Sequence, residues 1–186
     1  MVICLLFASF TGCIEDPALE PAEKVDEIKD EPDNTIDDTN ETKNTVECEL
    51  VPYGHCSGED FSGQELFEMN GGKLIGIDFS YANLNDARLY GTWLYGANLT
   101  GADLNWATLA YADLRYAVLT GTELAYTNLK NAKLTGADLR DAKLTGANLT
   151  YANLSFADFT DAIVTDTDFT DTYWYQTVWT DGVAYD

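Results

Sequence analysis

The sequence predicts an all-β fold, a four-sided solenoid of stacked parallel coils. Three observations predict it: a large apolar residue at every fifth position from Phe79 to Trp179, a small residue two positions before each, and a glycine that often follows two positions after. A helix and a straight strand are both excluded. Five residues advance a helix by about 500°, and residues five apart on a strand face opposite sides. The chain must therefore turn once in each repeat.

Turns near a right angle would close one coil after four repeats, roughly twenty residues, and successive coils would pair at about 4.8 Å. Glycines such as Gly96 and Gly101 suit the corners, where a positive φ is easily adopted. Threonines such as Thr122 and Thr127 take the small inward position, and we expect their hydroxyls to bond nearby backbone, because an unpaired buried hydroxyl costs about 1–3 kcal/mol. The predicted core column is Leu84, Leu89, Leu94, Leu99, Leu104, Leu109, Leu114, Leu119, Leu124, Leu129, Leu134, Leu139, Leu144, Leu149 and Leu154.

The motif of alanine, aspartate or asparagine, leucine and two variable residues begins at Ala97, Ala102, Ala137 and Ala147. This pattern resembles that of pentapeptide-repeat proteins, over about residues 57–182. The resemblance implies a right-handed quadrilateral parallel β-helix, with about five to six coils here. The handedness comes from the resemblance and not from the spacing.

Both ends of the repeat depart from the regular pattern. The phase shifts by three residues across Phe67–Gly72, and we expect a loop or bulge there in the first coil. Near the other end, Trp174 and Trp179 enlarge the core position, as expected for a cap that protects the end of a solenoid. Residues 183–186 are predicted to be a short C-terminal tail.

Residues 1–13 are predicted to be a signal peptide with a lipoprotein processing box. The apolar run 2–12 is shorter than the about twenty residues that span a bilayer, and it fits the apolar region of a secretory signal. A small residue, Gly12, directly precedes Cys13, which resembles the processing site of bacterial lipoproteins and implies a lipid on Cys13. An ordinary signal peptide and a disordered apolar end are the alternatives, because Phe10 replaces the usual leucine and no basic residue precedes the run.

Residues 14–47 are predicted to be a disordered acidic linker. They are rich in glutamate, aspartate, proline, asparagine and threonine and nearly free of aromatic residues, the composition of chains that do not bury a core. Such a segment would tether the solenoid at a distance from a membrane. The sequence thus predicts an extracytoplasmic, membrane-anchored protein.

Residues 48–56 are predicted to form a small disulfide loop between Cys48 and Cys56. Seven residues separate the two cysteines, across a turn-like stretch, and in an oxidising compartment such a pair is most simply a disulfide. Free thiols and a metal site that includes His55 are the alternatives. Two thiols and one imidazole make a poor zinc site, so we expect no metal and no other cofactor.

No catalytic residues are predicted, because the chain has one histidine and no nucleophile with a partner at motif spacing. Aromatic residues at the corners are the candidate interaction surface, although they could equally shield neighbouring coils. With twenty residues per coil, three successive corners of one coil carry aromatic residues, and the same corners do so again further along. The six candidates are Trp106, Tyr111, Tyr116, Tyr126, Tyr151 and Phe156.

The charge and the predicted location point to a non-catalytic scaffold that binds an unknown protein partner and meets the membrane through its lipid. A net charge of −22 disfavours direct nucleic-acid binding. The alternative is DNA mimicry, since the resemblance includes acidic pentapeptide-repeat proteins that bind DNA gyrase. An exported protein would not meet gyrase, so this alternative depends on the cellular compartment.

Overall fold

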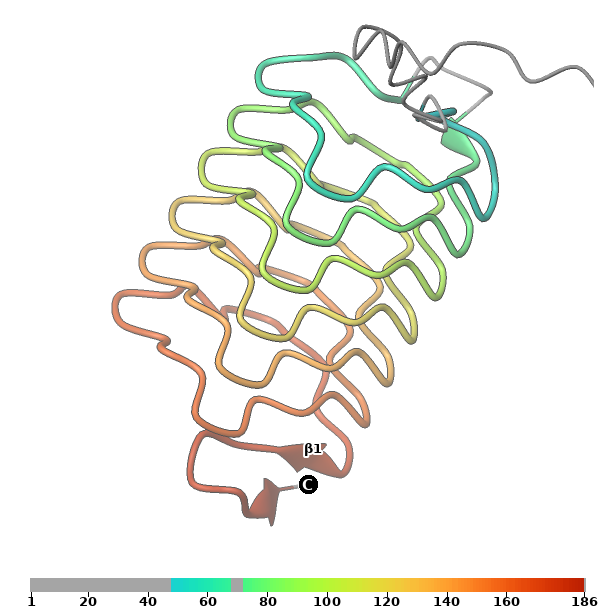
Figure 1. The fold of residues 1–186 in the computed structure, drawn as a ribbon. Helices are drawn as coiled ribbons and strands as arrows, with labels where there is room; N and C mark the ends of the chain where they lie inside the picture. Colours follow the sequence, from blue (N-terminus) through green and yellow to red (C-terminus); the bar gives the residue numbers. More distant parts are fainter. Residues whose placement is uncertain (1–47, 68–71, 186) are drawn as a thin grey trace, which may run out of the picture. The chain divides into compact units, whose positions relative to one another are not determined.

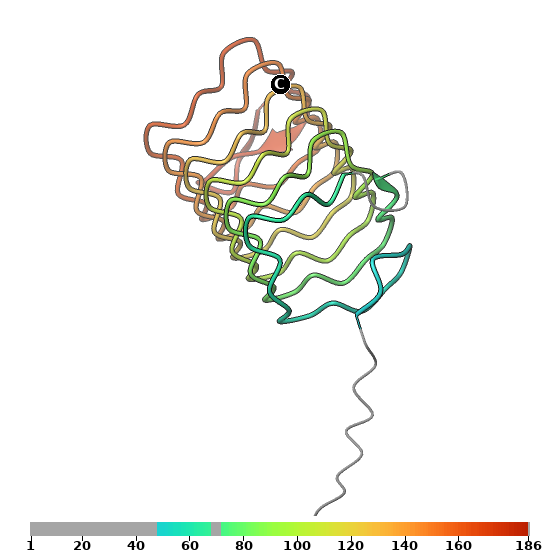
Figure 2. The same cartoon turned by 90° about the horizontal axis from the view of Figure 1, so that it is seen from above.

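The computed structural model describes residues 48–67 and 72–185, which lie within the compact unit Asn44–Asp186. These residues form a stack of four-sided coils, which Figure 1 shows from the side and Figure 2 from above. The predicted signal peptide and linker, residues 1–47, lie outside the described residues, as does most of the expected loop at Phe67–Gly72.

Single parallel bridges join each coil to the next at every fifth residue. Asp78 pairs with Asn98, Asn98 with Val118, and Val118 with Asp138. Bridged partners along this column are twenty residues apart, so one coil holds four repeats. The predicted parallel solenoid is therefore confirmed, and its pairing consists of isolated bridges in place of long strands.

The first coil contains three additional residues. His55 pairs with Asp78 and Glu65 with Arg88, partners 23 residues apart, whereas Lys73 and Trp93 are 20 apart. The insertion lies between Glu65 and Lys73, which confirms the predicted shift of phase at this place.

Each corner is a tight turn that follows a core residue. The amide of Ala97 donates to the carbonyl of Leu94 at 3.0 Å, and the intervening Gly96 has φ 64°. A hydrogen bond across four residues with a positive φ at the third is typical of a type II β-turn. Non-glycine residues adopt the same conformation at other corners, for example Tyr126 with φ 58° and Asp141 with φ 58°.

The predicted leucine column forms the core, and each of its members is 0–1% exposed. Phe79 and Phe159 extend it, and alanines such as Ala97 and Ala102 fill the remaining space. Burial of one such leucine contributes about 1.5–3 kcal/mol. Because each coil contacts only its neighbours, this column is a one-dimensional core along the stack.

The inward threonines bond to the backbone, as predicted. The hydroxyl of Thr122 donates to the carbonyl of Leu99 at 2.9 Å and that of Thr127 to Leu104 at 2.7 Å, in each case one coil back. Among the described residues, no buried side-chain polar atom is without a hydrogen-bond partner.

Where an aspartate or asparagine precedes a core residue, it has a structural role that the sequence did not reveal. Its side-chain oxygen accepts the backbone N–H two residues further on, as in Asn98 to Thr100 at 3.1 Å and Asp158 to Thr160 at 2.9 Å. This local bond explains why the repeat alternates freely between the two residue types, because both carry the required oxygen.

A short antiparallel hairpin ends the stack. Strand β1, Thr177–Val178, pairs with β2, Ala184–Tyr185 (Figure 1). Residues 184–185, within the predicted C-terminal tail, are thus held by main-chain pairing.

Aromatic rings gather beneath this hairpin. The rings of Trp174 and Trp179 lie 5.1 Å apart, and those of Phe169 and Trp174 lie 5.3 Å apart. Phe169, Trp174 and Trp179 are partly buried and line a hollow of about 470 Å³. Larger side chains thus occupy the core position where no further coil covers it.

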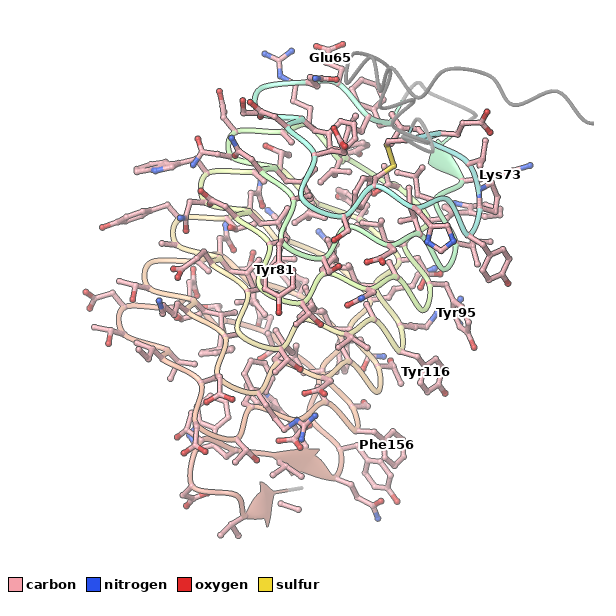
Figure 3. All side chains as sticks on the ribbon, in the orientation of Figure 1. Glu65, Lys73, Tyr81, Tyr95, Tyr116 and Phe156 are labelled. Atoms are coloured by element: carbon pink, nitrogen blue, oxygen red, sulfur yellow. A yellow bond between two sulfur atoms is a disulfide. The ribbon has the colours of Figure 1, made fainter. Side chains whose placement is uncertain are left out.

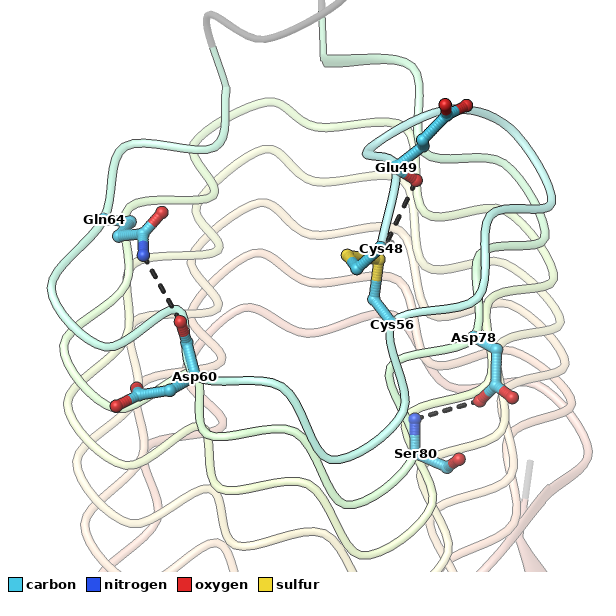
Figure 4. The surroundings of a disulfide bond; sticks show 7 residues. All are labelled: Cys48, Glu49, Cys56, Asp60, Gln64, Asp78 and Ser80. Carbon is cyan, nitrogen blue, oxygen red and sulfur yellow. Dashed lines mark hydrogen bonds between the residues drawn. A yellow bond between two sulfur atoms is a disulfide. The ribbon is translucent and has the colours of Figure 1, made fainter. Parts of the chain in front are cut away.

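At the other end, Cys48 and Cys56 are joined in the structure, with Cα atoms 4.8 Å apart (Figure 4). Cys56 occupies a core position and is 1% exposed, and Cys48 packs against the core. The bond therefore holds residues 48–55 against the first coil. The adjacent His55 pairs through its backbone with Asp78 in the ladder.

Candidate interaction surface

The six predicted corner aromatics all project from the coils and all have positive φ. Their exposed fractions range from 49% for Tyr151 to 59% for Trp106. Bulky side chains rarely adopt a left-handed backbone, and here the turn that closes each repeat imposes it. The rings are consequently held on a backbone that the coil ladder fixes on both sides.

These six side chains do not form one continuous patch. Two of them lie on each of three different edges of the stack. Trp106 and Tyr126 stack on one edge, with ring centroids 4.4 Å apart and planes 16° from parallel. This confirms the predicted column of twenty-residue spacing. Tyr111 and Tyr151 belong to a second edge, and Tyr116 and Phe156 to a third, where Figure 3 shows both on the same side of the molecule.

Several corner rings cover the next coil, as the shielding interpretation expects. The ring of Tyr116 lies over Gly136 and that of Tyr126 over Gly146, each one coil further on. Tyr151 instead donates to Asp171, and this carboxylate raises the pKa of the phenol. Each ring therefore shields a neighbour with one part and remains about half exposed with the rest.

Sequence reasoning missed further exposed aromatic residues that flank the core positions, among them Tyr90, Trp93 and Tyr95. Tyr90 contacts Tyr111 at 5.4 Å between centroids, and Tyr95 contacts Tyr116 at 5.5 Å. Trp93 and Tyr95 flank the core residue Leu94 in a single repeat, and that pattern was the signal available in the sequence.

Trp93 and Tyr95 belong to one side of the stack that we call the basic face. It consists of two outward columns, Lys73, Trp93, Asp113, Lys133, Asn153 and Tyr173, and Ile75, Tyr95, Arg115, Thr135, Ser155 and Tyr175. These columns carry three cations and one carboxylate, whereas the whole chain has a net charge of −22. The sign of the charge on this face is therefore opposite to that of the protein.

A shallow hollow of about 450 Å³ lies on the basic face, with Trp93, Tyr95 and Tyr111 among its lining residues. Arg115 and Asp113 also line it and form a two-pronged ion pair, Nε to Oδ1 and Nη2 to Oδ2, both at 2.7 Å. Burial alone would raise the pKa of Asp113, but the hydrogen bonds from Arg115 hold it below its usual value.

The remaining ion pairs are spread over other parts of the surface. Asp138 pairs with Arg140 at 2.6 Å, and the Arg140 guanidinium lowers the pKa of this carboxyl. Glu123 pairs with Lys143 across one coil step at 2.5 Å. Only the second of these exposed contacts joins neighbouring coils, and each contributes little individually.

The part of the chain that the structure describes contains no group of three or more histidine, cysteine or carboxylate residues that could hold a metal ion. No helix within residues 48–67 and 72–185 has the length and apolar character to cross a membrane. Cys13, the predicted lipid site, lies outside the described residues.

A model of pentapeptide repeats matches residues 69–101, 102–141 and 137–173, with eight copies of the repeat. The matched span exceeds half of the 186 residues. The chain belongs to the pentapeptide-repeat family. Membership implies the right-handed coil expected from the sequence, and members of this family are generally structural or interaction proteins without enzymatic activity.

Solved pentapeptide-repeat structures include three that resemble this chain to different degrees. HetL, involved in heterocyst differentiation regulation in the cyanobacterium Nostoc sp. strain PCC 7120, is 26% identical over 72% of this chain and 67% of its own, with a TM-score of 0.48. QnrB1, a plasmid-mediated fluoroquinolone resistance protein, is 19% identical over 66% and 80%, with a TM-score of 0.40. A protein from the Arabidopsis thaliana thylakoid lumen is 34% identical over 60% and 69%, with a TM-score of 0.25. A comparison with curated protein sequences gave no match.

Proposed function

We propose that this pentapeptide-repeat protein is a non-catalytic scaffold, anchored outside the cytoplasm through a lipid on Cys13, that presents its rigid β-helix to a protein partner. The observation that carries the proposal is the set of half-exposed aromatic rings on a backbone fixed by the coil ladder. Tryptophan and tyrosine bury much area at little entropic cost and dominate the binding energy of protein interfaces. A rigid scaffold lowers that cost further.

The stacked pair Trp106 and Tyr126 is the best-defined element of this surface. Both side chains are more than half exposed, and their parallel packing fixes the orientation of both. Together they form a small apolar surface on one edge, which suits an apolar side chain of a partner.

Site-specific photo-crosslinking in intact cells tests the interaction. We expect a crosslinker at position 126 to give one defined adduct, and a crosslinker at Asp161, an exposed corner on a different edge, to give none. Loss of the position-126 adduct on Trp106→Ala would support a shared surface. The absence of any adduct from crosslinkers placed on all four edges would refute the scaffold function.

The anchor needs a separate test. In detergent phase partitioning, the wild-type protein should enter the detergent phase and the Cys13→Ala variant the aqueous phase. Wild-type protein that stays in the aqueous phase would exclude the lipid anchor but would leave the interaction surface to be judged by crosslinking.

DNA mimicry is the second candidate, and one feature favours it. Asp141 and Asp161 occupy the same corner in successive coils, beside Asp138 and Asp158 in the adjoining column. A regular line of carboxylates offers a basic DNA-binding protein a substitute for phosphates. Inhibition of purified DNA gyrase in a supercoiling assay, relieved by changing Asp141 and Asp161 to asparagine, would favour mimicry over the scaffold.

A further inference from the structure

The basic face differs from the rest of the surface in charge and in shape. Trp93 and Tyr95 are 51% and 42% exposed, and Tyr111 on the adjoining edge is 53% exposed. The hollow between these rings has a volume of about 450 Å³, within the range of about 300–1,000 Å³ usual for small-ligand sites. Figure 3 shows Lys73, Tyr95 and Tyr116 along this side of the coil stack.

The polar groups of the hollow are held in place before any ligand arrives. The Arg115 guanidinium is bound by both oxygens of Asp113 and lies over the ring of Tyr95, 5.6 Å from its centroid. A guanidinium has five N–H donors, and this ion pair uses two. Lys133 follows Asp113 in the ladder, one coil further on, and its exposed ammonium adds a second cation to the rim.

The backbone N–H and C=O groups of this face already form hydrogen bonds between coils. Leu94 donates to the carbonyl of Asp113 at 2.9 Å, and Asp113 donates to that of Thr92 at 2.9 Å. A peptide therefore finds no main-chain edge for strand addition, which is the usual source of affinity for extended peptides. A ligand at this face must be bound by side chains alone.

Flat aromatic rings beside fixed charged groups suit a sugar. The C–H face of a pyranose ring packs on an aromatic plane, while its hydroxyls exchange hydrogen bonds with charged planar groups such as Arg115 and Asp113. A carboxylate on the sugar would complement the excess of cations on the basic face.

We propose that the basic face binds an anionic saccharide, a short run of uronic acid residues. Trp93 and Tyr111 provide the stacking planes, Arg115 and Lys133 pair with the sugar carboxylates, and Asp113 accepts a hydrogen bond from a ring hydroxyl. The proposal is independent of the membrane anchor and of the edge formed by Trp106 and Tyr126.

Isothermal titration calorimetry with the full chain tests the proposal, with oligogalacturonate as the probe. The matched control ligand is the methyl ester of the same oligosaccharide, which keeps the sugar rings and removes the charges. We expect binding of oligogalacturonate and weakening of about tenfold or more with the ester. Trp93→Ala and Lys133→Ala should each weaken binding by about tenfold.

Trp106→Ala is the matched control variant, because Trp106 is also an exposed tryptophan, 59% exposed, but lies on another edge. It should bind oligogalacturonate as the wild type does. Equal binding of the ester, equal loss in Trp106→Ala, or no binding of oligogalacturonate would overturn the proposal. Tighter binding of an oligoglutamate peptide than of oligogalacturonate would also overturn it and assign the face to an acidic protein segment.

Discussion

The ring of Tyr126 lies directly over Gly146, one coil further along the stack. A Cβ atom built on Gly146 would lie 2.7 Å from two carbons of this ring, closer than unbonded atoms can approach. The same relationship joins Tyr81 to Gly101, where the distance is 2.7 Å. These tyrosine rings thus exclude a Cβ at the corner twenty positions later, so such a surface aromatic side chain constrains the sequence of the following coil. Tyr111 and Tyr151 are followed instead by Asn131 and Asp171, so the constraint holds only where the ring lies over the next corner.

Replacement of Gly146 by alanine should therefore destabilise the protein through two separable effects. Gly146 has φ 68°, a conformation that costs alanine about 1–2 kcal/mol, and the new methyl group would also displace the Tyr126 ring. Gly121→Ala is the matched control, since Gly121 has φ 64° and nothing within 4 Å of an added Cβ. Urea denaturation should show a larger loss of unfolding free energy for Gly146→Ala than for Gly121→Ala.

The ring contact can be isolated by combining Gly146→Ala with Tyr126→Ala. In the Tyr126→Ala background, Gly146→Ala should lower the unfolding free energy by no more than Gly121→Ala does. Residues in contact give non-additive changes in free energy, so removing the ring removes the extra cost. Additive losses would show that the Tyr126 ring moves aside at no cost and does not constrain Gly146.

The buried threonine hydroxyls should contribute to stability through their backbone bonds. Thr127 donates to the carbonyl of Leu104 at 2.7 Å and is 0% exposed, and valine has nearly the same shape without the hydroxyl. Thr127→Val should lose about 1 kcal/mol of unfolding free energy. This carbonyl would still accept the amide of Ala107, so the loss stays near that of one hydrogen bond.

Thr135→Val is the control for this change, since Thr135 lies at an outward and only partly buried position. Its unfolding free energy should stay within about 0.5 kcal/mol of the wild type. A gain in stability for Thr127→Val would mean that the core favours a fully apolar column over the hydroxyl bond.

Acid should destabilise the folded protein through Asp138. The hydrogen bond from Arg140 lowers the pKa of this carboxyl in the folded state, so the unfolded chain binds its proton more readily. The stabilisation is then complete above the unfolded pKa of about 3.9 and is lost as the pH falls through the lower folded value. Unfolding free energy measured from pH 7 to pH 2 should fall in this acidic range.

Asp138→Asn should make that fall smaller. Asparagine retains the oxygen that accepts the Arg140 amide, as Asn98 does for Thr100 in the same column, so the fold should persist. Asp161→Asn, at an exposed corner, is the control. A pH dependence that Asp138→Asn leaves unchanged would assign the acid sensitivity to other carboxylates.

The coil itself could be predicted from the sequence because few backbone conformations bring every fifth side chain into one core. The core column, the inward threonines and the twenty-residue stacking of Trp106 on Tyr126 all follow from that one period. The pairing of Ala184–Tyr185 with β1 could not be predicted, because these residues lie beyond the repeat and main-chain bonding decides their conformation.

The basic face was not predicted either, although its residues are plain in the sequence. Trp93 and Tyr111 are eighteen positions apart, and only the coil register brings them to one hollow. Arg115 becomes a fixed donor through its contact with Tyr95, again across one coil. Contacts between side columns and corners depend on side-chain directions that the repeat pattern does not specify.

The disulfide should stabilise the first coil far more than the rest of the stack. In the chain-entropy description, closing the short loop between Cys48 and Cys56 contributes about 2–3 kcal/mol. Because coils contact only their neighbours, changing both cysteines to serine should raise hydrogen exchange at residues 55–66 and leave the leucine column near Leu119 protected. Unreduced wild-type protein should resist alkylation at both positions. Alkylation of Cys48 without reductant, or equal loss of protection along the whole stack, would contradict this role.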